Sequence, residues 1–172
     1  SPPPVSCRLV EWGAGIVTHS PTKYMDGQVA GVVGCIVESG TFDWTRYPDK
    51  FPGLCTPDET YHGVTYTQRF GLEGAYITKA TSQLMRDFGS IQSPQNAFLL
   101  NFGLEDLHLR MPQHCKNGQA LAEYVSAHPK VSWVRYCGLP GDDCYELARQ
   151  YLPNGSCGWV SFGVAGGREG AQ

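Results

Sequence analysis

The chain has 172 residues, of which 41% are hydrophobic and 17% are charged, and its formal net charge is -3. This length and composition suit a globular protein with a sizeable core, and the mild acidity argues against nucleic acid or an anionic membrane as the main partner. No apolar run approaches the roughly 20 residues that a membrane-spanning helix needs.

The first half of the chain predicts two strands, a long connection and a helix. Two apolar runs, residues 10–18 and 29–38, are typical of strands covered on both faces in an α/β sheet. Residues 43–69 are rich in Pro, Gly, Thr and Tyr without a clear period, and a connection of this length is expected to be functional or to contact another subunit. A helix is predicted over residues 72–88, with Gly89 as its C-terminal cap.

The second half predicts helices and then alternating strands and helices. Ser93 and Pro94 are typical of an N-cap and a first helical position. Apolar residues at spacings of three and four then mark one helix face: Leu104, Leu107, Met111 and Cys115. Pro112 interrupts this face, so we expect a kink or a new helix start there. The further predicted elements are helix 120–127, strand 131–136, helix 143–151 and strand 158–164, with Trp133, Tyr136 and Trp159 in the core.

Seven cysteines are scattered along the chain: Cys7, Cys35, Cys55, Cys115, Cys137, Cys144 and Cys157. An odd number without a Cys-x-x-Cys pair argues against a disulfide framework and a zinc knuckle. We therefore expect reduced thiols, no metal site and a cytosolic setting. No thiol has an activating neighbour in the sequence, so a catalytic cysteine is not expected.

Lys23 lies in the run His19-Ser20-Pro21-Thr22-Lys23-Tyr24-Met25-Asp26-Gly27. A lysine after two hydroxyl residues, at a strand end and before a glycine-containing turn, suits a lysine that forms a Schiff base. Enzymes dependent on pyridoxal phosphate (PLP) need such an amine for the cofactor aldehyde and hydroxyl donors for its phosphate. The alternative is a surface lysine after a strand, because Ser-x-Thr-Lys is a short pattern.

Other segments carry a resemblance across nearly the whole chain. The run from Gly13 to Ser20 resembles the strand that leads to the cofactor lysine in the Cys/Met-metabolism PLP-dependent enzymes. Segments that resemble later parts of the family, in its order and spacing, are Gly34-Cys35-Ile36-Val37, Phe42-Asp43-Trp44, Tyr61-His62-Gly63, Leu84 to Gly89, Ser93 to Phe98, Gly103-Leu104-Glu105 and Leu109-Arg110-Met111. The stretch from Phe51 to Gly63 most resembles the O-acetylhomoserine sulfhydrylase branch.

The resemblance implies an α/β, aspartate-aminotransferase-like fold (fold type I of the PLP-dependent transferases) with a mostly parallel sheet. Residues 1–112 would form the C-terminal part of the PLP-binding large domain, and residues 113–172 an incomplete C-terminal α/β domain. It also implies that Lys23 holds PLP and shuttles protons, and that Ser20 and Thr22 donate hydrogen bonds to its phosphate. The implied reaction converts O-acetylhomoserine and sulfide, or a thiol, to homocysteine and acetate in a cytoplasmic homotetramer. A segment of such an assembly would expose apolar surface.

Other family-like residues are expected to have structural roles. Arg110 on a helix is expected to form an ion pair, and Arg86 with Asp87 a charge pair at a helix end. His62 and His114 are expected to be hydrogen-bonded structural histidines.

The sequence departs from the family directly after the lysine. Asp26-Gly27-Gln28-Val29 replaces a Gly-Gly-His-Gly-type turn. Asp26 brings negative charge close to the expected phosphate site, and Val29 removes backbone freedom. The geometry of this turn is therefore expected to differ from that of the family.

The resemblance also places several family features outside the sequence. The phosphate-binding glycine turn, the ring-stacking aromatic and the aspartate that pairs with the pyridine nitrogen would precede Ser1, and the arginine for the substrate carboxylate would follow Gln172. Because these features are missing from the sequence, we expect the middle of a longer enzyme. Ser1-Pro2-Pro3-Pro4 is not typical of a signal peptide. The alternatives are a cystathionine γ-lyase or γ-synthase of the same superfamily, a non-catalytic remnant that acts as a subunit-interaction module, and a generic α/β binding domain. The last has no GxxxxGKS/T, GxGxxG or GxSxG motif to support it.

Overall fold

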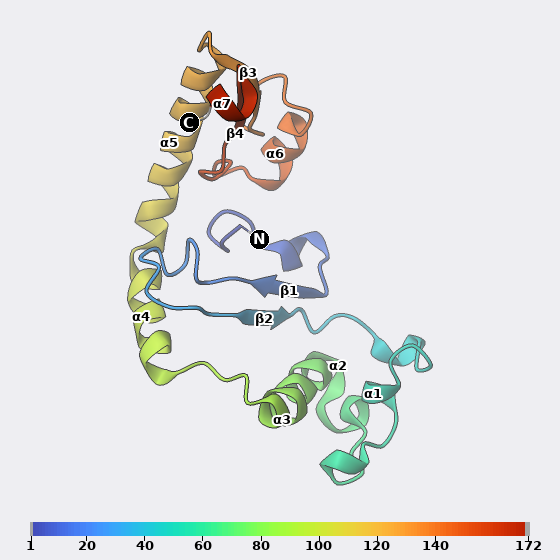
Figure 1. Ribbon diagram of the computed structural model, residues 1–172. Coiled ribbons are helices and arrows are strands. Elements are labelled where there is room, and N and C mark those ends of the chain that lie inside the picture. Colours follow the sequence, from blue (N-terminus) through green and yellow to red (C-terminus); the bar gives the residue numbers. More distant parts are fainter. Residues whose placement is uncertain (1, 171–172) are drawn as a thin grey trace. The chain divides into compact units, whose positions relative to one another are not determined.

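The computed structural model describes residues 2–170, and the chain divides into two compact units (Figure 1). Leu9–Asn101 forms the first unit. Pro2–Arg8 and the chain from Phe102 onward form the second. Each unit is described by itself below.

The first unit begins with a 3₁₀ turn and a two-stranded antiparallel sheet. Leu9–Trp12 forms the turn, and β1 (Ile16–His19) pairs with β2 (Cys35–Glu38) (Figure 1). Both strands are shorter than the predicted apolar runs. Gly13 takes a left-handed φ of +91° after the turn, so the extended backbone of the first strand begins only beyond it.

Antiparallel pairing is the pattern of both sheets. The family resemblance implies a mostly parallel sheet, but within residues 2–170 the strands pair only as β1 with β2 and β3 with β4, each antiparallel. Parallel neighbours need a crossover connection, usually a helix, whereas β1 and β2 are joined through turns and loop. The described residues therefore contribute antiparallel ladders alone.

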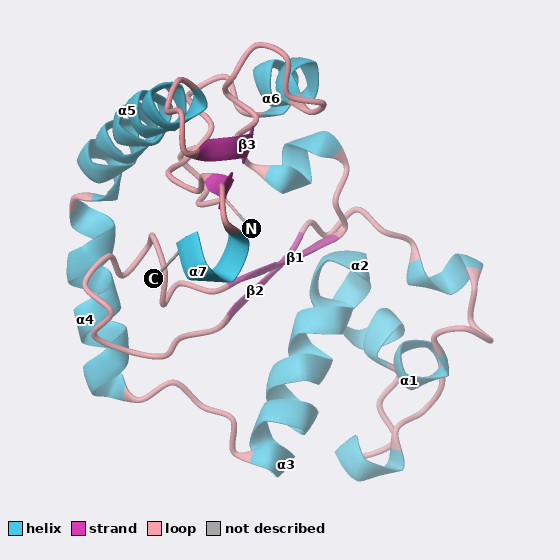
Figure 2. Cartoon of the chain, turned by 45° about the horizontal axis from the view of Figure 1, so that its top comes forward, coloured by secondary structure: helices cyan, strands magenta, loops and turns pink. Residues whose placement is uncertain are grey.

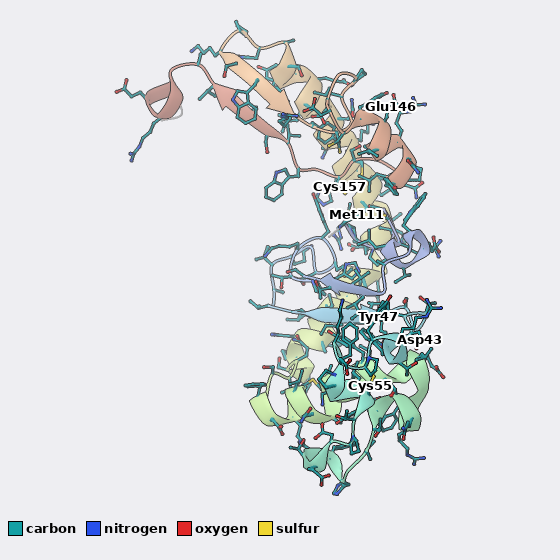
Figure 3. The ribbon with its side chains drawn as sticks, turned by 90° about the vertical axis from the view of Figure 1, so that its right-hand side faces the viewer. Asp43, Tyr47, Cys55, Met111, Glu146 and Cys157 are labelled. Carbon is teal, nitrogen blue, oxygen red and sulfur yellow. The ribbon has the colours of Figure 1, made fainter. Side chains whose placement is uncertain are left out.

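The connection without a clear period folds into three short helical turns. These are Trp44–Arg46, α1 (Pro52–Cys55) and Glu59–Tyr61. Asp43 begins the first and Asp58 the third, because each aspartate side chain accepts a 3.0 Å hydrogen bond from the backbone N–H two residues later. Figure 3 labels Asp43 and Cys55 in this segment.

An aromatic core, defined as the buried cluster of Trp44, Leu54, Tyr66 and Ala75, lies beneath these turns. Trp44 stacks on Tyr76 with ring centroids 5.7 Å apart. Tyr66 is fully buried. Aromatic pairs contribute about 0.5–1.5 kcal/mol beyond the area that they bury. The segment between the sheet and α2 therefore supplies much of the core of this unit.

A long helical run follows the aromatic core. It consists of α2 (Tyr66–Lys79), a π-helical segment (Ala80–Met85) and α3 (Arg86–Phe88). Gly71 has φ +68° and ψ -177° and kinks α2, so unbroken helical geometry begins after it. Gly89 ends the run with φ +67°, which confirms the predicted helix end and its glycine cap.

Two further helices follow, α4 (Pro94–Glu105) and α5 (Leu107–Ser126). The Asn96 N–H donates to Ser93 Oγ at 3.1 Å, which confirms the predicted cap. A new helix start at Pro112 is wrong, because Pro112 lies inside α5 and the chain breaks earlier, at Asp106. A buried face on both sides of the proline stabilises α5: Leu107, Met111, Cys115, Gly118, Ala122 and Val125.

The second unit packs a β-ribbon against α5 (Figure 2). The ribbon pairs β3 (Val131–Arg135) with β4 (Ser161–Val164), α6 (Tyr145–Tyr151) lies between them in the sequence, and the short α7 (Gly167–Gly170) follows. These elements confirm the predicted order of strand, helix and strand.

The aromatic residues of this unit differ in burial. Tyr136 is 3% exposed, as predicted for a core residue. The same prediction is wrong for Trp133 and Trp159, which are 53% and 80% exposed. A two-stranded ribbon covered by one helix leaves part of its surface open, so not every aromatic residue on it can be buried.

Many large apolar side chains are exposed, as expected of a segment that belongs to a larger assembly. Those with the greatest exposure include Phe88, Ile91, Phe98, Leu109 and Trp159. In the described part of the chain, no helix combines the length and apolarity needed to cross a membrane.

Candidate cofactor-binding site

The chain turns repeatedly directly after β1, and Lys23 lies inside these turns. The Lys23 N–H donates to the Ser20 carbonyl at 3.2 Å, and the Gly27 N–H donates to the Lys23 carbonyl at 2.9 Å. The Asp26 N–H donates to the Pro21 carbonyl at 2.8 Å. Residues 20–33, which we call the lysine turn, thus begin with a hydrogen-bonded backbone, and the side chains of Ser20 and Lys23 are exposed.

Thr22 closes the lysine turn. Its side chain is 8% exposed, and its Oγ1 accepts a 2.8 Å hydrogen bond from the Val33 N–H. The same hydroxyl donates to the Val33 carbonyl at 3.3 Å. A hydroxyl has one hydrogen to donate. Thr22 must therefore rotate its hydroxyl away from Val33 to donate to a phosphate, whereas the exposed Ser20 has no such contact in the described residues.

Asp26 closes the turn at a second point. Its carboxylate is 2% exposed, and Oδ2 accepts a 2.7 Å hydrogen bond from the Ala30 N–H. This role was missed in the sequence, where Asp26 was read only as a negative charge near the phosphate site. The available signal was the Asp-Gly pair, because aspartate side chains commonly bond to nearby backbone in turns.

Val29 lies at a position of the turn where the backbone is left-handed, as its replacement of a family glycine led us to expect. It has φ +56°, in the left-handed region that β-branched residues rarely occupy, and its side chain is 83% exposed. Gly27 also has a positive φ, +72°, which glycine adopts without strain. Gly27, which the family also has, thus adopts a conformation suited to glycine. Val29 adopts left-handed backbone as well, although it is β-branched.

His19, at the end of β1, directly precedes the exposed Ser20. Burial lowers the pKa of His19 below its usual value, because desolvation disfavours the charged imidazolium. The neutral ring is therefore favoured at the point where the chain enters the lysine turn.

Two of the other family-like residues form the predicted ion pairs, and the structural roles of His62 and His114 stay predictions. Arg110 Nε lies 2.6 Å from Asp106 Oδ1 and Arg86 Nε lies 2.8 Å from Asp87 Oδ1, which confirms both ion pairs. His62 ends the third helical turn with φ +57°. Arg110 and His114 belong to α5, in the second unit. Residues 2–170 contain no group of three or more His, Cys, Asp or Glu side chains that could hold a metal ion.

The residues of the lysine turn fit a PLP phosphate and aldehyde in their chemistry. Lys23 offers an exposed amine, and Ser20 offers an exposed hydroxyl directly after the last residue of β1. Thr22 adds a hydroxyl already fixed in position by Val33. The carboxylate of Asp26 is turned inward onto Ala30, which directs one of its oxygens to a backbone donor.

Comparison with known proteins identifies the family of the chain. Residues 2–172 match the sequence profile of the family described as Cys/Met metabolism PLP-dependent enzyme. The chain is 46% identical to the homocysteine/cysteine synthase of Kluyveromyces lactis over 92% of its own length and 35% of that relative. It is 37% identical to the O-acetyl-L-homoserine sulfhydrylase of Leptospira meyeri over 99% of its length and 40% of that relative.

A solved structure gives the same fold. The Campylobacter jejuni protein assigned as an O-acetylhomoserine (thiol)-lyase, which contains a pyridoxyl-lysine monophosphate, matches with a TM-score of 0.86 and 28% identity. The match covers 94% of this chain and 40% of that one, so the chain spans well under half the length of the relatives it matches. The fold is thus a part of the fold type I architecture of PLP-dependent enzymes, and the chain belongs to the Cys/Met metabolism PLP-dependent enzyme family.

Proposed function

We propose that this chain forms part of an O-acetylhomoserine sulfhydrylase in which Lys23 holds PLP. The observation that carries the proposal is the exposed Lys23 amine in the hydrogen-bonded turn after β1, within a chain that matches the family from residue 2 onward. The relatives that it resembles are named homocysteine synthases and O-acetyl-L-homoserine sulfhydrylases. The proposed reaction takes O-acetylhomoserine and sulfide to homocysteine and acetate.

Each residue of the lysine turn has one proposed task. Lys23 would bind the cofactor through Nζ, and its amine would hold and move a proton during turnover. A positioned amine of this kind contributes about 10²–10⁴-fold. Ser20 donates to the phosphate, and Thr22 does so after its hydroxyl turns from the Val33 carbonyl. When bound, PLP supplies the electron sink that lets the acetyl ester leave as acetate. Asp26 and Thr22 hold the backbone on which Lys23 lies.

The organisation of the whole enzyme belongs to the same proposal. We assign residues 1–112 to the large, PLP-binding domain and residues 113–172 to the C-terminal domain, of which residues 1, 171 and 172 lie outside the described part. The partners are an amino-acid substrate, sulfide or a thiol, and further copies of the chain in a cytoplasmic homotetramer. Exposed apolar side chains in both units support an assembly that covers them.

A PLP titration tests the cofactor role of Lys23. The native full chain should give a saturable visible absorbance band, and borohydride should fix the label on the peptide that contains Lys23. Lys23→Ala should lose both signals, whereas Lys116→Ala, a change at an exposed lysine of α5, should keep them. Equal labelling of the wild type and Lys23→Ala would refute the assignment.

Turnover distinguishes the substrate class. The cofactor-loaded enzyme should release acetate from O-acetylhomoserine in the presence of sulfide and should leave cystathionine largely unreacted. A preference for cystathionine would instead assign the enzyme to the lyase or γ-synthase branch. A PLP-loaded protein that turns over neither substrate would favour the non-catalytic, subunit-interaction alternative.

A further inference from the structure

Three segments of the second unit meet at Cys115, a buried residue of α5. A Cβ atom built on Gly155 would lie 2.7 Å from Cys115 Sγ, so the loop after α6 crosses α5 directly at this thiol. A Cβ on Gly118, one helical turn later, would lie 2.6 Å from the Cys157 carbonyl oxygen. Tyr136, just after β3, donates its hydroxyl hydrogen to that same oxygen at 2.9 Å. Cys157 is thus held beside the turn of α5 that carries Cys115.

The thiols in this region influence one another. Burial raises the pKa of the Cys157 thiol, and the neighbouring thiols of Cys115, Cys137 and Cys7 raise it further, with Cys115 first among them. A hydrogen bond with Ser6 acts in the opposite direction. All seven cysteines of the chain are free thiols, but these four lie in one part of one unit.

The cluster is accessible to a small molecule. Cys115 and Cys137 line a cavity of about 460 Å³, together with polar side chains that include Gln119 and Arg149. Cys157 is partly exposed, and Figure 3 shows it in the loop between α6 and β4. A hydroperoxide is small enough to enter such a cavity and meet the Cys115 thiol there.

We propose that Cys115 and Cys157 are an oxidation site that forms an intramolecular disulfide when a hydroperoxide enters this cavity. The Cys115 sulfur attacks the O–O bond and becomes a sulfenic acid, while the leaving oxygen takes a proton and departs as water or an alcohol. The Cys157 sulfur then attacks the sulfenic sulfur, the S–S bond forms, and the hydroxyl leaves as water with the thiol proton. Two thiols lose two electrons in total, and the hydroperoxide gains them.

The backbone contacts favour a link between Cys115 and Cys157. A disulfide needs Cα atoms within about 7 Å of each other, and the contacts at Gly118 and Gly155 bring the backbone around Cys157 against the helix around Cys115. Cys157 has φ +63°, so the loop is already held in an uncommon conformation at this residue. The bond would fix the loop after α6 to α5.

The test oxidises the native, cofactor-loaded full chain with hydrogen peroxide. The intact mass should fall by two hydrogen atoms, the count of seven thiols under denaturing conditions should fall by two, and a proteolytic fragment should link Cys115 to Cys157. Cys157→Ser and Cys115→Ser should each abolish the linked fragment. Cys115→Ala serves as a second variant if the serine at this buried position prevents folding.

Matched variants separate this pair from general oxidation. Cys144→Ser removes an exposed thiol of the same unit, and Cys137→Ser removes the other thiol of the cavity; both should leave the linked fragment unchanged. A link from Cys115 to Cys137, or peroxide products confined to single cysteines without any linked fragment, would overturn the proposal. Neither result depends on Lys23 or on the proposed sulfhydrylase reaction.

Discussion

The aromatic core and the lysine turn belong to the same unit but are held together in different ways. The aromatic core buries whole rings, with Trp44 6% exposed and Tyr66 fully buried. The lysine turn instead exposes Val29 and Val32, at 83% and 86%, and relies on hydrogen bonds to single backbone groups. Stability is therefore concentrated in one region and the proposed chemistry in the other.

This difference predicts how each region responds to substitution. Burial depends on the volume of a side chain, so the core should respond to the loss of a ring and little to the loss of a polar atom. The lysine turn should show the opposite sensitivity, because a few polar atoms hold a backbone that buries little apolar surface.

The largest effect is expected for Tyr66→Ala. The change removes the largest fully buried side chain of the aromatic core and should lower the free energy of unfolding by about 3–5 kcal/mol. Chemical denaturation of the wild type and the variant measures this difference. The activity of the fraction that remains folded should change little, because Tyr66 lies outside the lysine turn.

Tyr66→Phe is the matched control. The Tyr66 hydroxyl is buried and has no hydrogen-bond partner within residues 2–170. Its removal should leave stability unchanged or raise it by up to about 1 kcal/mol, since a buried unpaired polar group is costly. A loss similar to that of Tyr66→Ala would show that the hydroxyl, and not the ring, carries the stabilisation.

A smaller effect is expected for Thr22→Val in the lysine turn. The change keeps the shape of the side chain but leaves the Val33 N–H without its acceptor, a penalty of about 1–3 kcal/mol. Hydrogen exchange should show the Val33 amide exchanging faster, and PLP should bind more weakly. Thr22→Ser retains the hydroxyl and should keep the amide protected; equal exchange in both variants would contradict the role of the hydroxyl.

The sequence was most informative where local chemistry determines the structure. Gly89 and Ser93 each marked a helix end correctly, because a cap depends on one residue and its immediate neighbours. Lys23 was likewise assigned as the cofactor lysine from its neighbours and the family resemblance, and this assignment stays a prediction. A new helix start at Pro112, one of the two predicted outcomes, was wrong because burial on both sides of Pro112 stabilises α5, and burial cannot be seen in a local pattern.

The parts that depend on distant contacts were not predicted. Residues 43–65 have no period, yet they supply Trp44 and Leu54 to the aromatic core, where both pack with Tyr66 and Ala75 of α2. The inward position of Asp26 also depends on the backbone folding back to Ala30. The prediction that Trp159 is buried was wrong because an aromatic residue is buried only where another element covers it, and Trp159 is 80% exposed.

A third prediction concerns Val29, where the lysine turn has unfavourable backbone. A left-handed conformation costs a non-glycine residue about 1–2 kcal/mol, and glycine loses part of that gain through its greater freedom when unfolded. Val29→Gly should therefore raise the free energy of unfolding by about 0.5–1 kcal/mol. Val32→Gly is the matched control, because Val32 is equally exposed but is not among the positive-φ residues, and it should give no gain. A gain in both variants would indicate relief of exposed apolar surface and not of backbone strain.

The smallest effect is expected at the edge of the aromatic core, in the ion pair of Asp58 and Lys79. Lys79 Nζ lies 2.7 Å from Asp58 Oδ2, and its hydrogen bond, followed by that of Thr60, lowers the pKa of Asp58 to about 2 from 3.8. Because the folded-state pKa is depressed, the pair stabilises the protein above pH 3.8 and loses that contribution as the pH falls toward about 2.

Asp58→Asn should therefore flatten the decline in unfolding free energy between pH 4 and pH 2. The control Asp49→Asn, at an exposed aspartate, should leave this decline as in the wild type. Denaturation at a series of pH values measures both slopes. Lys79 Nζ also lies 4.7 Å from the centroid of the Tyr66 ring, so this charge contacts the aromatic core directly. If Asp58→Asn left the decline as steep as in the wild type, the ion pair would not contribute, because asparagine should retain the helix-capping bond from the Thr60 N–H.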